Sequence, residues 1–180
     1  PHDNMEIISI PLEGDLQHKD SMGTVATIRH GDIQAMSAGT GVRHSEYNAS
    51  KENPVKFLQI WILPNATNVK PRYDQITLDL KDRHNQLQQI LSPHAGGPGV
   101  WIHQQAWFHL GNFDKDFQVE YELKRQGNGV YAFVLNGDFK IGDQLLHHRD
   151  GYGIWDIEKL DITALSSSSE ILLMEVPMEV

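Results

Sequence analysis

The 180-residue chain contains no cysteine, and this absence excludes several kinds of site. Disulfides, zinc–thiolate sites, iron–sulfur clusters and cysteine nucleophiles all require thiols. Basic residues are also few, because 15 lysines and arginines stand against 24 aspartates and glutamates, which gives a formal net charge of −9. Such an acidic chain is not expected to have a nucleic-acid backbone or an anionic membrane surface as its main partner.

Long apolar runs are absent as well. Stretches such as residues 57–63 and 171–174 are far too short for a transmembrane helix. The proportions of hydrophobic residues, 39%, and of charged residues, 22%, favour one or two compact soluble domains. Histidine, in contrast, occurs ten times. In a chain without thiols, a borderline metal would have to be held by imidazole and carboxylate groups.

Short strand-like segments separated by turn signals recur along the whole chain, and they predict an all-β protein. One such turn signal is Asn136-Gly137, which favours a tight hairpin. The recurrence is typical of antiparallel strands in a sandwich or barrel, and a degenerate repeat between the two halves predicts two barrels in tandem. The predicted strands are residues 5–12, 16–20, 24–28, 33–36, 42–47, 57–63, 100–103, 107–110, 117–123, 131–135, 139–141, 152–155 and 171–176.

The middle of the chain differs in composition from both halves. Residues 65–74 are polar and contain Pro71, so we predict a linker there. The Gly/Pro-rich segment 96–99 is the best candidate for a boundary between two units.

Two segments near the N-terminus carry side chains that suit a metal. In an extended strand residues two apart share a face, so His44 and Glu46 would project to the same side. If the first residues are extended too, His2, Asn4 and Glu6 share a face. Imidazole and carboxylate together suit iron or manganese. The alternatives are a buried His44 bonded to a backbone carbonyl, a surface Glu46 and a solvated His2 near the terminus.

Several long motifs together resemble the pirin family. They are residues 2–6, 12–23, 36–48, 58–64 and 71–73. The resemblance implies a bicupin, which consists of two tandem cupin domains of the antiparallel β-barrel or jelly-roll type. We expect a metal-bearing N-terminal domain with its linker over residues 1–92 and a C-terminal domain without a metal site over residues 93–180. The chain opens without methionine, so the first domain is expected to lack its N-terminal strands.

The resemblance also implies a ligand set of three histidines and one glutamate around one metal. His2 corresponds to the second histidine of a His-Pro-His segment whose first histidine would precede Pro1, and His44 and Glu46 correspond to the other pair. Glu6 is then assigned to the core or to a supporting position beside the ligands. The expected metal is iron, as Fe2+ or Fe3+, with manganese, nickel, cobalt, copper and zinc as alternatives.

The activity implied by the resemblance is that of a quercetin 2,3-dioxygenase. Such an enzyme uses O2 to cleave the heterocyclic ring of a flavonol and releases carbon monoxide. A metal can lower the pKa of the substrate hydroxyl, and Glu46 could accept the proton as a general base. The planar aromatic substrate would lie in an apolar barrel interior, and the candidate lining residues are Met5, Ile7, Met36 and Phe57.

Two alternatives to this activity stay open at the level of sequence. Some pirins bind a metal and modulate a transcription factor or a metabolic enzyme without turnover, which would require a protein partner. The other alternative is a stress-related cupin that acts on a different substrate. No secretory signal is visible, so a cytoplasmic location is expected.

Overall fold

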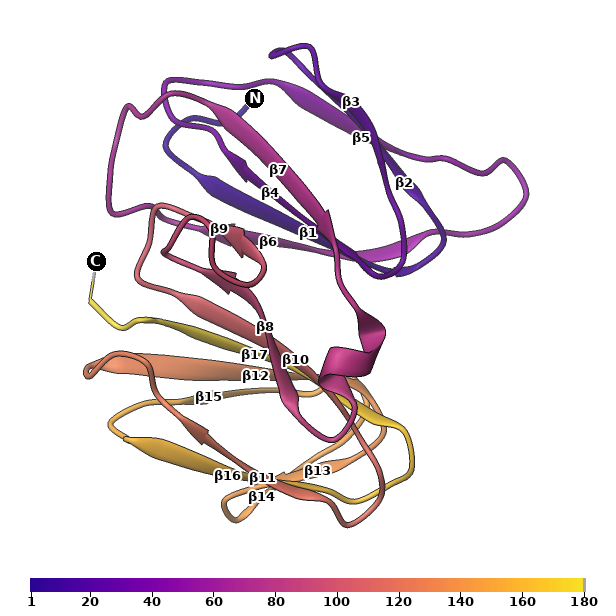
Figure 1. Cartoon of the computed structure of the whole chain (residues 1–180), viewed down its shortest axis with the longest axis vertical. Helices are drawn as coiled ribbons and strands as arrows, with labels where there is room; N and C mark the ends of the chain where they lie inside the picture. Colours follow the sequence, from indigo (N-terminus) through magenta and orange to yellow (C-terminus); the bar gives the residue numbers. More distant parts are fainter. Residues whose placement is uncertain (180) are drawn as a thin grey trace. The chain divides into compact units, whose positions relative to one another are not determined.

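The computed structural model describes residues 1–179, which form two compact units (Figure 1). Unit 1 comprises residues 1–78 and 92–104, and unit 2 comprises residues 79–91 and the chain from residue 105 onward. Within residues 1–179 the only helix is a single 3-10 turn, η1 (Leu80–Arg83), so the predicted all-β class is confirmed. No helix in this part of the chain is both long and apolar enough to span a membrane.

Unit 1 is built from two antiparallel sheets that enclose a common interior. One sheet has the strand order β6-β1-β4-β7 and the other has the order β3-β2-β5. A hydrogen bond from Ser9 to Glu46 joins the two sheets across the interior. The strands of this unit are β1 (Glu6–Glu13), β2 (Leu16–Asp20), β3 (Val25–Ile28), β4 (Asp32–Ser37), β5 (His44–Asn48), β6 (Lys56–Ile62), β7 (Arg72–Thr77) and the short β9 (Val100–Trp101).

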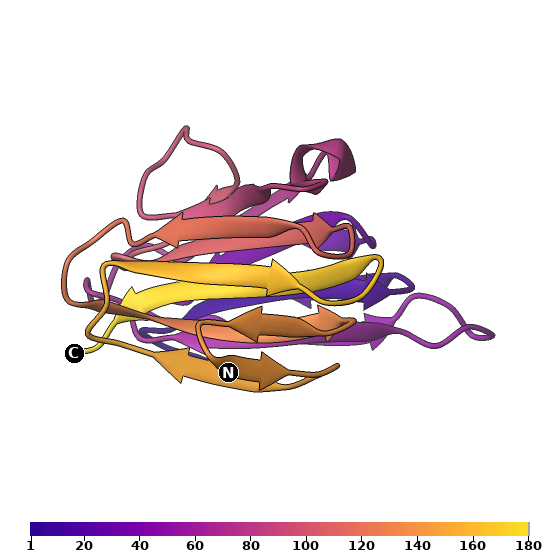
Figure 2. The same ribbon diagram turned by 90° about the horizontal axis from the view of Figure 1, so that it is seen from below.

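Alternation along β1 decides which side chains enter this interior. Ile7 and Ser9 face the second sheet, whereas Glu6 lies on the opposite face of β1. Ile7 packs with Met36, and Met5 covers the same cluster, so these candidate lining residues belong to the core of unit 1. Phe57 is partly buried on β6. The loop that joins β5 to β6 projects beyond the strands in both views (Figures 1 and 2).

The polar segment predicted as a linker, residues 65–74, contains the beginning of strand β7. The predicted linker is therefore wrong for residues 72–74, which form part of a strand. These polar residues can lie in a strand because hydrogen bonds within unit 1 satisfy their side chains. Arg72 donates to the carbonyl of Trp101 (2.7 Å) and to Asp74 (3.1 Å), and the Tyr73 hydroxyl donates to Gln75 (2.6 Å). Hydrophobic periodicity therefore failed to identify a strand whose polar groups have their own partners.

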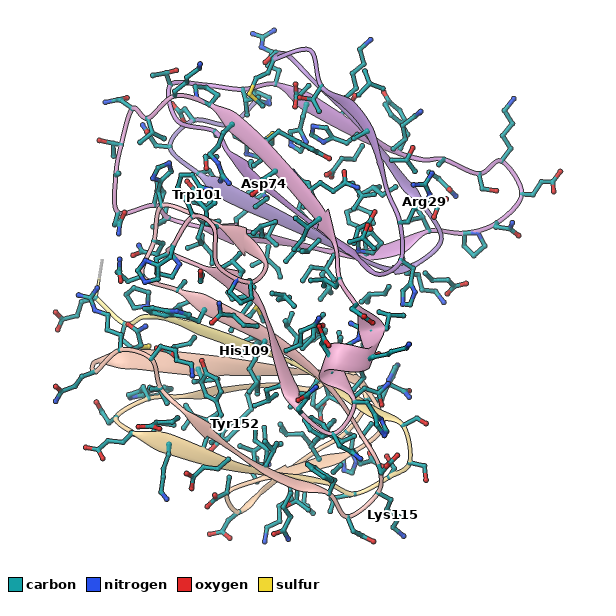
Figure 3. The ribbon with its side chains drawn as sticks, in the orientation of Figure 1. Arg29, Asp74, Trp101, His109, Lys115 and Tyr152 are labelled. Atoms are coloured by element: carbon teal, nitrogen blue, oxygen red, sulfur yellow. The ribbon has the colours of Figure 1, made fainter. Side chains whose placement is uncertain are left out.

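A buried carboxyl group lies beside Arg72 on the outer face of the four-stranded sheet. Glu6 has no solvent exposure and accepts a hydrogen bond from Ser37 Oγ (2.8 Å), which also accepts from Arg72 (3.3 Å). Trp101 and Asp74, both labelled in Figure 3, are the other contacts of Arg72, whose guanidinium lies 3.8 Å from the Trp101 ring centre. Burial raises the pKa of Glu6 to about 7, although the hydrogen bond from Ser37 and the positive charge of Arg72 oppose this shift.

Glu6 should make the stability of unit 1 depend on pH. Its carboxyl group binds a proton more tightly in the folded chain than in the unfolded chain. The stabilisation is therefore complete below about pH 4.5 and is lost as the pH rises through about 7. Urea denaturation should show that the free energy of unfolding falls by about 3 kcal/mol between pH 4.5 and pH 8. Glu6→Gln should remove most of this loss, whereas the exposed control Glu52→Gln should not. An equally steep profile in Glu6→Gln would contradict this assignment.

Unit 2 repeats the two-sheet arrangement. Its larger sheet runs in the order β15-β12-β17-β10-β8, and its smaller sheet runs in the order β11-β16-β13-β14. Figure 2 shows β17, in yellow, among the strands of the larger sheet. The strands are β8 (Leu87–Ser92), β10 (Trp107–Phe113), β11 (Gln118–Glu122), β12 (Asn128–Asn136), β13 (Phe139–Ile141), β14 (Gln144–Leu146), β15 (Gly151–Ile154), β16 (Lys159–Ala164) and β17 (Ser169–Pro177).

The interior of unit 2 contains one fully buried carboxylate, Glu175 on β17. It accepts hydrogen bonds from the Tyr121 hydroxyl (2.6 Å) and the Asn128 amide (2.9 Å). The backbone N–H groups of Lys124 (2.9 Å) and Arg125 (3.0 Å) also donate to it. The carboxylate therefore connects the turn between β11 and β12 to strand β17 through hydrogen bonds. The hydrophobic cluster of unit 2 surrounds this region and includes Phe113, Val130, Phe139, Ile162 and Leu173.

The chain alternates between the two units in the region of the predicted boundary. Residues 79–91 belong to unit 2, and residues 92–104 return to unit 1. The domains predicted over residues 1–92 and 93–180 stay a prediction. The structure adds that the chain passes from unit 1 to unit 2 after residue 78 and returns to unit 1 at residue 92.

Candidate metal centre

The candidate site lies on the inner face of the three-stranded sheet of unit 1. Neighbouring strands β2 and β5 place His18 opposite Glu46 and Asp20 opposite His44. Along β2, inward residues are buried and the residues between them are exposed, which directs His18 into the interior.

A glycine turn determines where β5 begins. Gly39 has a φ of +48°, in the left-handed region that favours glycine. A side chain at this position would also collide with the backbone carbonyl of Val69. Thr40 donates its N–H to the same carbonyl (3.0 Å), so the turn is fixed to the segment before β7. His44 follows this turn as the first residue of β5.

Three side chains converge closely enough to share one metal ion. Ligand atoms of His18, His44 and Glu46 all lie within 4.8 Å of one another. His18 is fully buried, and the side chains of His44 and Glu46 are 8% and 10% exposed. The Nδ1 atoms of both histidines are buried, and neither makes a hydrogen bond within residues 1–179. His18 uses its Nε2 to contact Asp20 Oδ2 (2.9 Å), which leaves Nδ1 as its free nitrogen.

Glu46 is held at both carboxylate oxygens. Ser9 Oγ donates to Oε1 (3.1 Å), and the side-chain amide of Gln59 donates to Oε2. Gln59 in turn accepts from the indole N–H of Trp61 (3.2 Å). These contacts fix the carboxylate in the interior, and each oxygen keeps a lone pair for a further partner.

The environment of the cluster sets the charge of its members. Burial, reinforced by the positive charges that His2 and His18 can carry, lowers the pKa of His44 to about 4. Burial raises the pKa of Glu46, against the hydrogen bonds from Ser9 and Gln59. His44 is therefore neutral near pH 7 with a lone pair available for a metal.

The residues present fit a first-row divalent metal. Two buried imidazole nitrogens without hydrogen bonds and a carboxylate form the mixed donor set that such ions prefer. The contact between His18 and Asp20 also matches a recurring arrangement, in which a carboxylate orients a metal-binding histidine through its other ring nitrogen.

Of the predicted site residues, the structure brings His44 and Glu46 together and places His2 beside them. The ring centres of His2 and His44 are 5.0 Å apart, and His2 also contacts Trp61 edge-on at 5.0 Å. The backbone of His2 pairs with Val42 through two hydrogen bonds, which hold it at the end of the barrel. The roles of His2, His44 and Glu46 as ligands stay predictions.

The predicted common face of His2, Asn4 and Glu6 is wrong. Asn4 has a φ of +43°, so the chain is not extended there and the alternation between faces is interrupted before β1. Glu6 consequently points away from the histidines, toward Ser37 and Arg72.

Sequence reasoning missed His18. The available signal was its spacing from Asp20, since a histidine and a carboxylate two apart share a face of a strand just as His44 and Glu46 do. Recognising that the two pairs meet requires the register between β2 and β5, which sequence periodicity does not provide.

Histidines outside this cluster have other surroundings. Within residues 1–179, one group of at least three histidine or acidic side chains is close enough to hold a metal, and it lies in unit 1. His109, labelled in Figure 3, is buried in unit 2, where its ring packs edge-on against Tyr121 at 5.0 Å. Burial lowers its pKa to about 4, and the charge of Lys124 contributes.

Two family models match the chain. Residues 1–62 match the model described as Pirin, and residues 89–176 match the model described as Quercetinase C-terminal cupin domain. A curated relative, the quercetin 2,3-dioxygenase of Escherichia coli strain K12, is 37% identical over 177 residues, which cover 98% of this chain and 74% of the relative. The pirin-like protein of Caulobacter vibrioides is 30% identical over 174 residues, or 96% of this chain and 74% of that protein.

Solved structures show the same similarity. The crystal structure of YhhW from E. coli superposes with a TM-score of 0.91 at 36% identity, covering 98% of this chain and 73% of that one. The structure of the bacterial pirin YhhW in complex with nickel(II) gives a TM-score of 0.90 at 35% identity, covering 98% and 74%. These similarities confirm the predicted resemblance, and the chain belongs to the pirin family of cupin proteins.

Proposed function

We propose that this protein is a metal-dependent quercetin 2,3-dioxygenase, which uses O2 to cleave the central ring of a flavonol. The observation that carries the proposal is the convergence of His18, His44 and Glu46 inside unit 1, with Glu46 held by hydrogen bonds at both oxygens. The relatives named quercetin 2,3-dioxygenase support the choice of flavonol and O2 as substrates.

The metal would be held by His18, His44 and Glu46, with His2 as a further candidate ligand from the neighbouring end of the barrel. We propose iron, and nickel is an alternative because the bacterial pirin YhhW forms a complex with nickel(II). When bound, the metal supplies Lewis-acid chemistry, which lowers the pKa of a coordinated hydroxyl group.

Glu46 is the group that takes the substrate's proton in this proposal. Its carboxylate lies within 4.8 Å of the ligand atoms of His18 and His44, close enough to accept a proton from a hydroxyl group held there. Ser9 and Gln59 keep the carboxylate pointing into the interior, so it does not have to reorient when substrate arrives. Ile7 and Met36 line the same interior with apolar surface, which excludes water from an aromatic ring system.

Replacement of Glu46 by glutamine tests this role. The change keeps the shape of the side chain but removes its basicity and its charge as a metal ligand, so quercetin turnover should fall at least about 100-fold when it is expressed per bound metal ion. Turnover is measured as the loss of quercetin absorbance with matching O2 consumption in the metal-loaded protein. Glu52→Gln, on the exposed loop after β5, is the matched control and should retain full activity.

The outcome separates the alternatives. If the metal-loaded protein does not turn quercetin over, the dioxygenase proposal fails, and a regulatory pirin that acts through a protein partner becomes the better description. In that case partner binding should disappear on chelation of the metal. The cytoplasmic location expected from the sequence stays a prediction.

A further inference from the structure

Two side chains of strand β6, Gln59 and Trp61, lie beside the candidate metal centre and remain in contact with solvent. The register places Gln59 opposite Ser9 and Trp61 opposite Ile7. Residues directly opposite each other in antiparallel strands share a face, so both lie on the face that carries Ser9 toward Glu46. Ser9 and Ile7 have no solvent exposure, whereas Gln59 is exposed and Trp61 is 56% exposed.

Hydrogen bonds connect the Trp61 ring to the carboxylate of Glu46. The indole N–H donates to the amide oxygen of Gln59 (3.2 Å), and the amide nitrogen of Gln59 donates to Glu46 Oε2. The other carboxylate oxygen, Oε1, accepts from Ser9 (3.1 Å) and lies 4.0 Å from His44 Nδ1. Gln59 therefore holds one oxygen of the carboxylate while the other lies near a candidate metal ligand.

The indole N–H selects one of two orientations of the Gln59 amide. A primary amide has an acceptor end and a donor end, and a half-turn about its last bond exchanges them. After this exchange the amide oxygen would face the carboxylate of Glu46, and the amide nitrogen would face an indole that only donates. Because Gln59 is exposed, packing does not fix its orientation and water could replace a single hydrogen bond. Two partners that favour the same orientation hold it.

We propose that Trp61 is a positioning residue of the metal centre, which acts through Gln59. Its indole N–H fixes the amide, and the amide keeps the Glu46 carboxylate beside His18 and His44. Hydrogen-bond partners that orient metal ligands typically contribute a factor of about 10–100 to metal affinity. This inference rests on the metal centre of the proposed function and does not depend on the substrate.

The experiment measures the dissociation constant for Ni2+ by titration of the whole chain. Trp61→Phe keeps an aromatic ring next to His2 and removes the indole N–H. It should weaken Ni2+ binding about tenfold, and Gln59→Leu should weaken it at least as much. The double variant should bind Ni2+ within about twofold of Gln59→Leu alone, because Trp61 then has no amide to orient.

Trp155→Phe is the matched control, since it makes the same change at a tryptophan of unit 2 that is 57% exposed. It should leave the affinity for Ni2+ unchanged. Thermal unfolding of metal-free Trp61→Phe should stay within about 2 °C of the wild type, because an exposed ring contributes little to the core. That result would show that the weaker binding does not come from a damaged fold.

A second measurement examines the hydrogen bond without any metal. Exchange of the Trp61 indole N–H with water is followed by NMR in the metal-free protein, and the signal is identified by its absence in Trp61→Phe. Exchange should be faster in Gln59→Leu, which removes the acceptor of this N–H. It should be unchanged in Gln17→Leu, which makes the same substitution at an exposed position on β2.

The outcomes separate this inference from the proposed function. If the wild type binds Ni2+ and Trp61→Phe binds it equally well, the role of Trp61 is overturned while the metal centre and the dioxygenase proposal survive. If the two changes weaken binding multiplicatively, Trp61 acts by another path, such as its contact with His2, and the inference fails. Unchanged indole exchange in Gln59→Leu, or a large drop in the thermal stability of Trp61→Phe, also overturns it. If the wild type does not bind Ni2+, this inference fails together with the metal centre of the proposed function.

Discussion

Replacing His44 with alanine is expected to weaken divalent-metal binding by more than about 100-fold. Its ring lies at the centre of the cluster, within reach of both His18 and Glu46, and only 8% of the side chain is exposed. Because burial and neighbouring histidines hold its pKa near 4, the imidazole is neutral near pH 7 and needs no deprotonation before it binds a metal. No other side chain within residues 1–179 completes an alternative group of three ligands.

Two measurements check this expectation. Elemental analysis after dialysis should give close to one first-row metal per wild-type chain and a small fraction of that for His44→Ala. Titration with Ni2+ should show the change in affinity directly. The control is His148→Ala, which removes an exposed histidine of unit 2 and should leave metal content unchanged. Metal content that is equal in His44→Ala and the wild type would place the site elsewhere.

The same assay decides between two histidines. The family resemblance predicts His2 as a ligand, whereas the geometry brings His18 within 4.8 Å of the other ligand atoms. His18→Ala should therefore reduce metal content at least as much as His2→Ala. Should only His2→Ala reduce it, His18 acts as a supporting residue beneath the ligands.

Replacing Glu175 with leucine is expected to reduce the free energy of unfolding of unit 2 by about 3–5 kcal/mol. The change removes a fully buried carboxylate and leaves its donors without an acceptor. Those donors are the Tyr121 hydroxyl, the Asn128 amide and the backbone N–H groups of Lys124 and Arg125. The turn between β11 and β12 would then lose its attachment to β17.

Urea denaturation measures this effect, and Glu158→Leu provides the control at an exposed position of the same unit. A double-mutant cycle with Tyr121→Phe isolates one contact of the network. Because the hydroxyl and the carboxylate are 2.6 Å apart, the two changes should cost less together than the sum of their separate effects. If the free energy of unfolding of Glu175→Leu were less than about 1 kcal/mol below that of the wild type, the groups that donate to Glu175 would have found other partners.

Much of the strand pattern follows from local sequence. Residues 16–20 alternate between buried and exposed, and the predicted and observed strands coincide there. Strand β7 could not be found in this way, since its residues are polar and are satisfied by partners from β4 and from residues 92–104. Strand β16 was also not predicted, although it alternates between buried and exposed residues.

The candidate site was predictable only in part, for reasons of geometry. The pair formed by His44 and Glu46 lies on one strand, so its common face follows from the spacing alone. The contribution of His18 depends on the register between two strands that are far apart in sequence. The common face expected for His2, Asn4 and Glu6 is wrong because of one residue, Asn4, whose left-handed backbone interrupts the alternation between faces.

The exchange of segments around residues 79–104 has a consequence for synthesis on the ribosome. Unit 1 includes residues 92–104, which are made only after β8 of unit 2. The first barrel therefore cannot complete its set of contacts, among them those of Trp101 with Arg72, until residue 104 has emerged. Until then β8, which belongs to the second barrel, has been synthesised but the other strands of its sheet in unit 2 have not. The two barrels must therefore mature in an overlapping order, although domains in most tandem proteins fold one after the other.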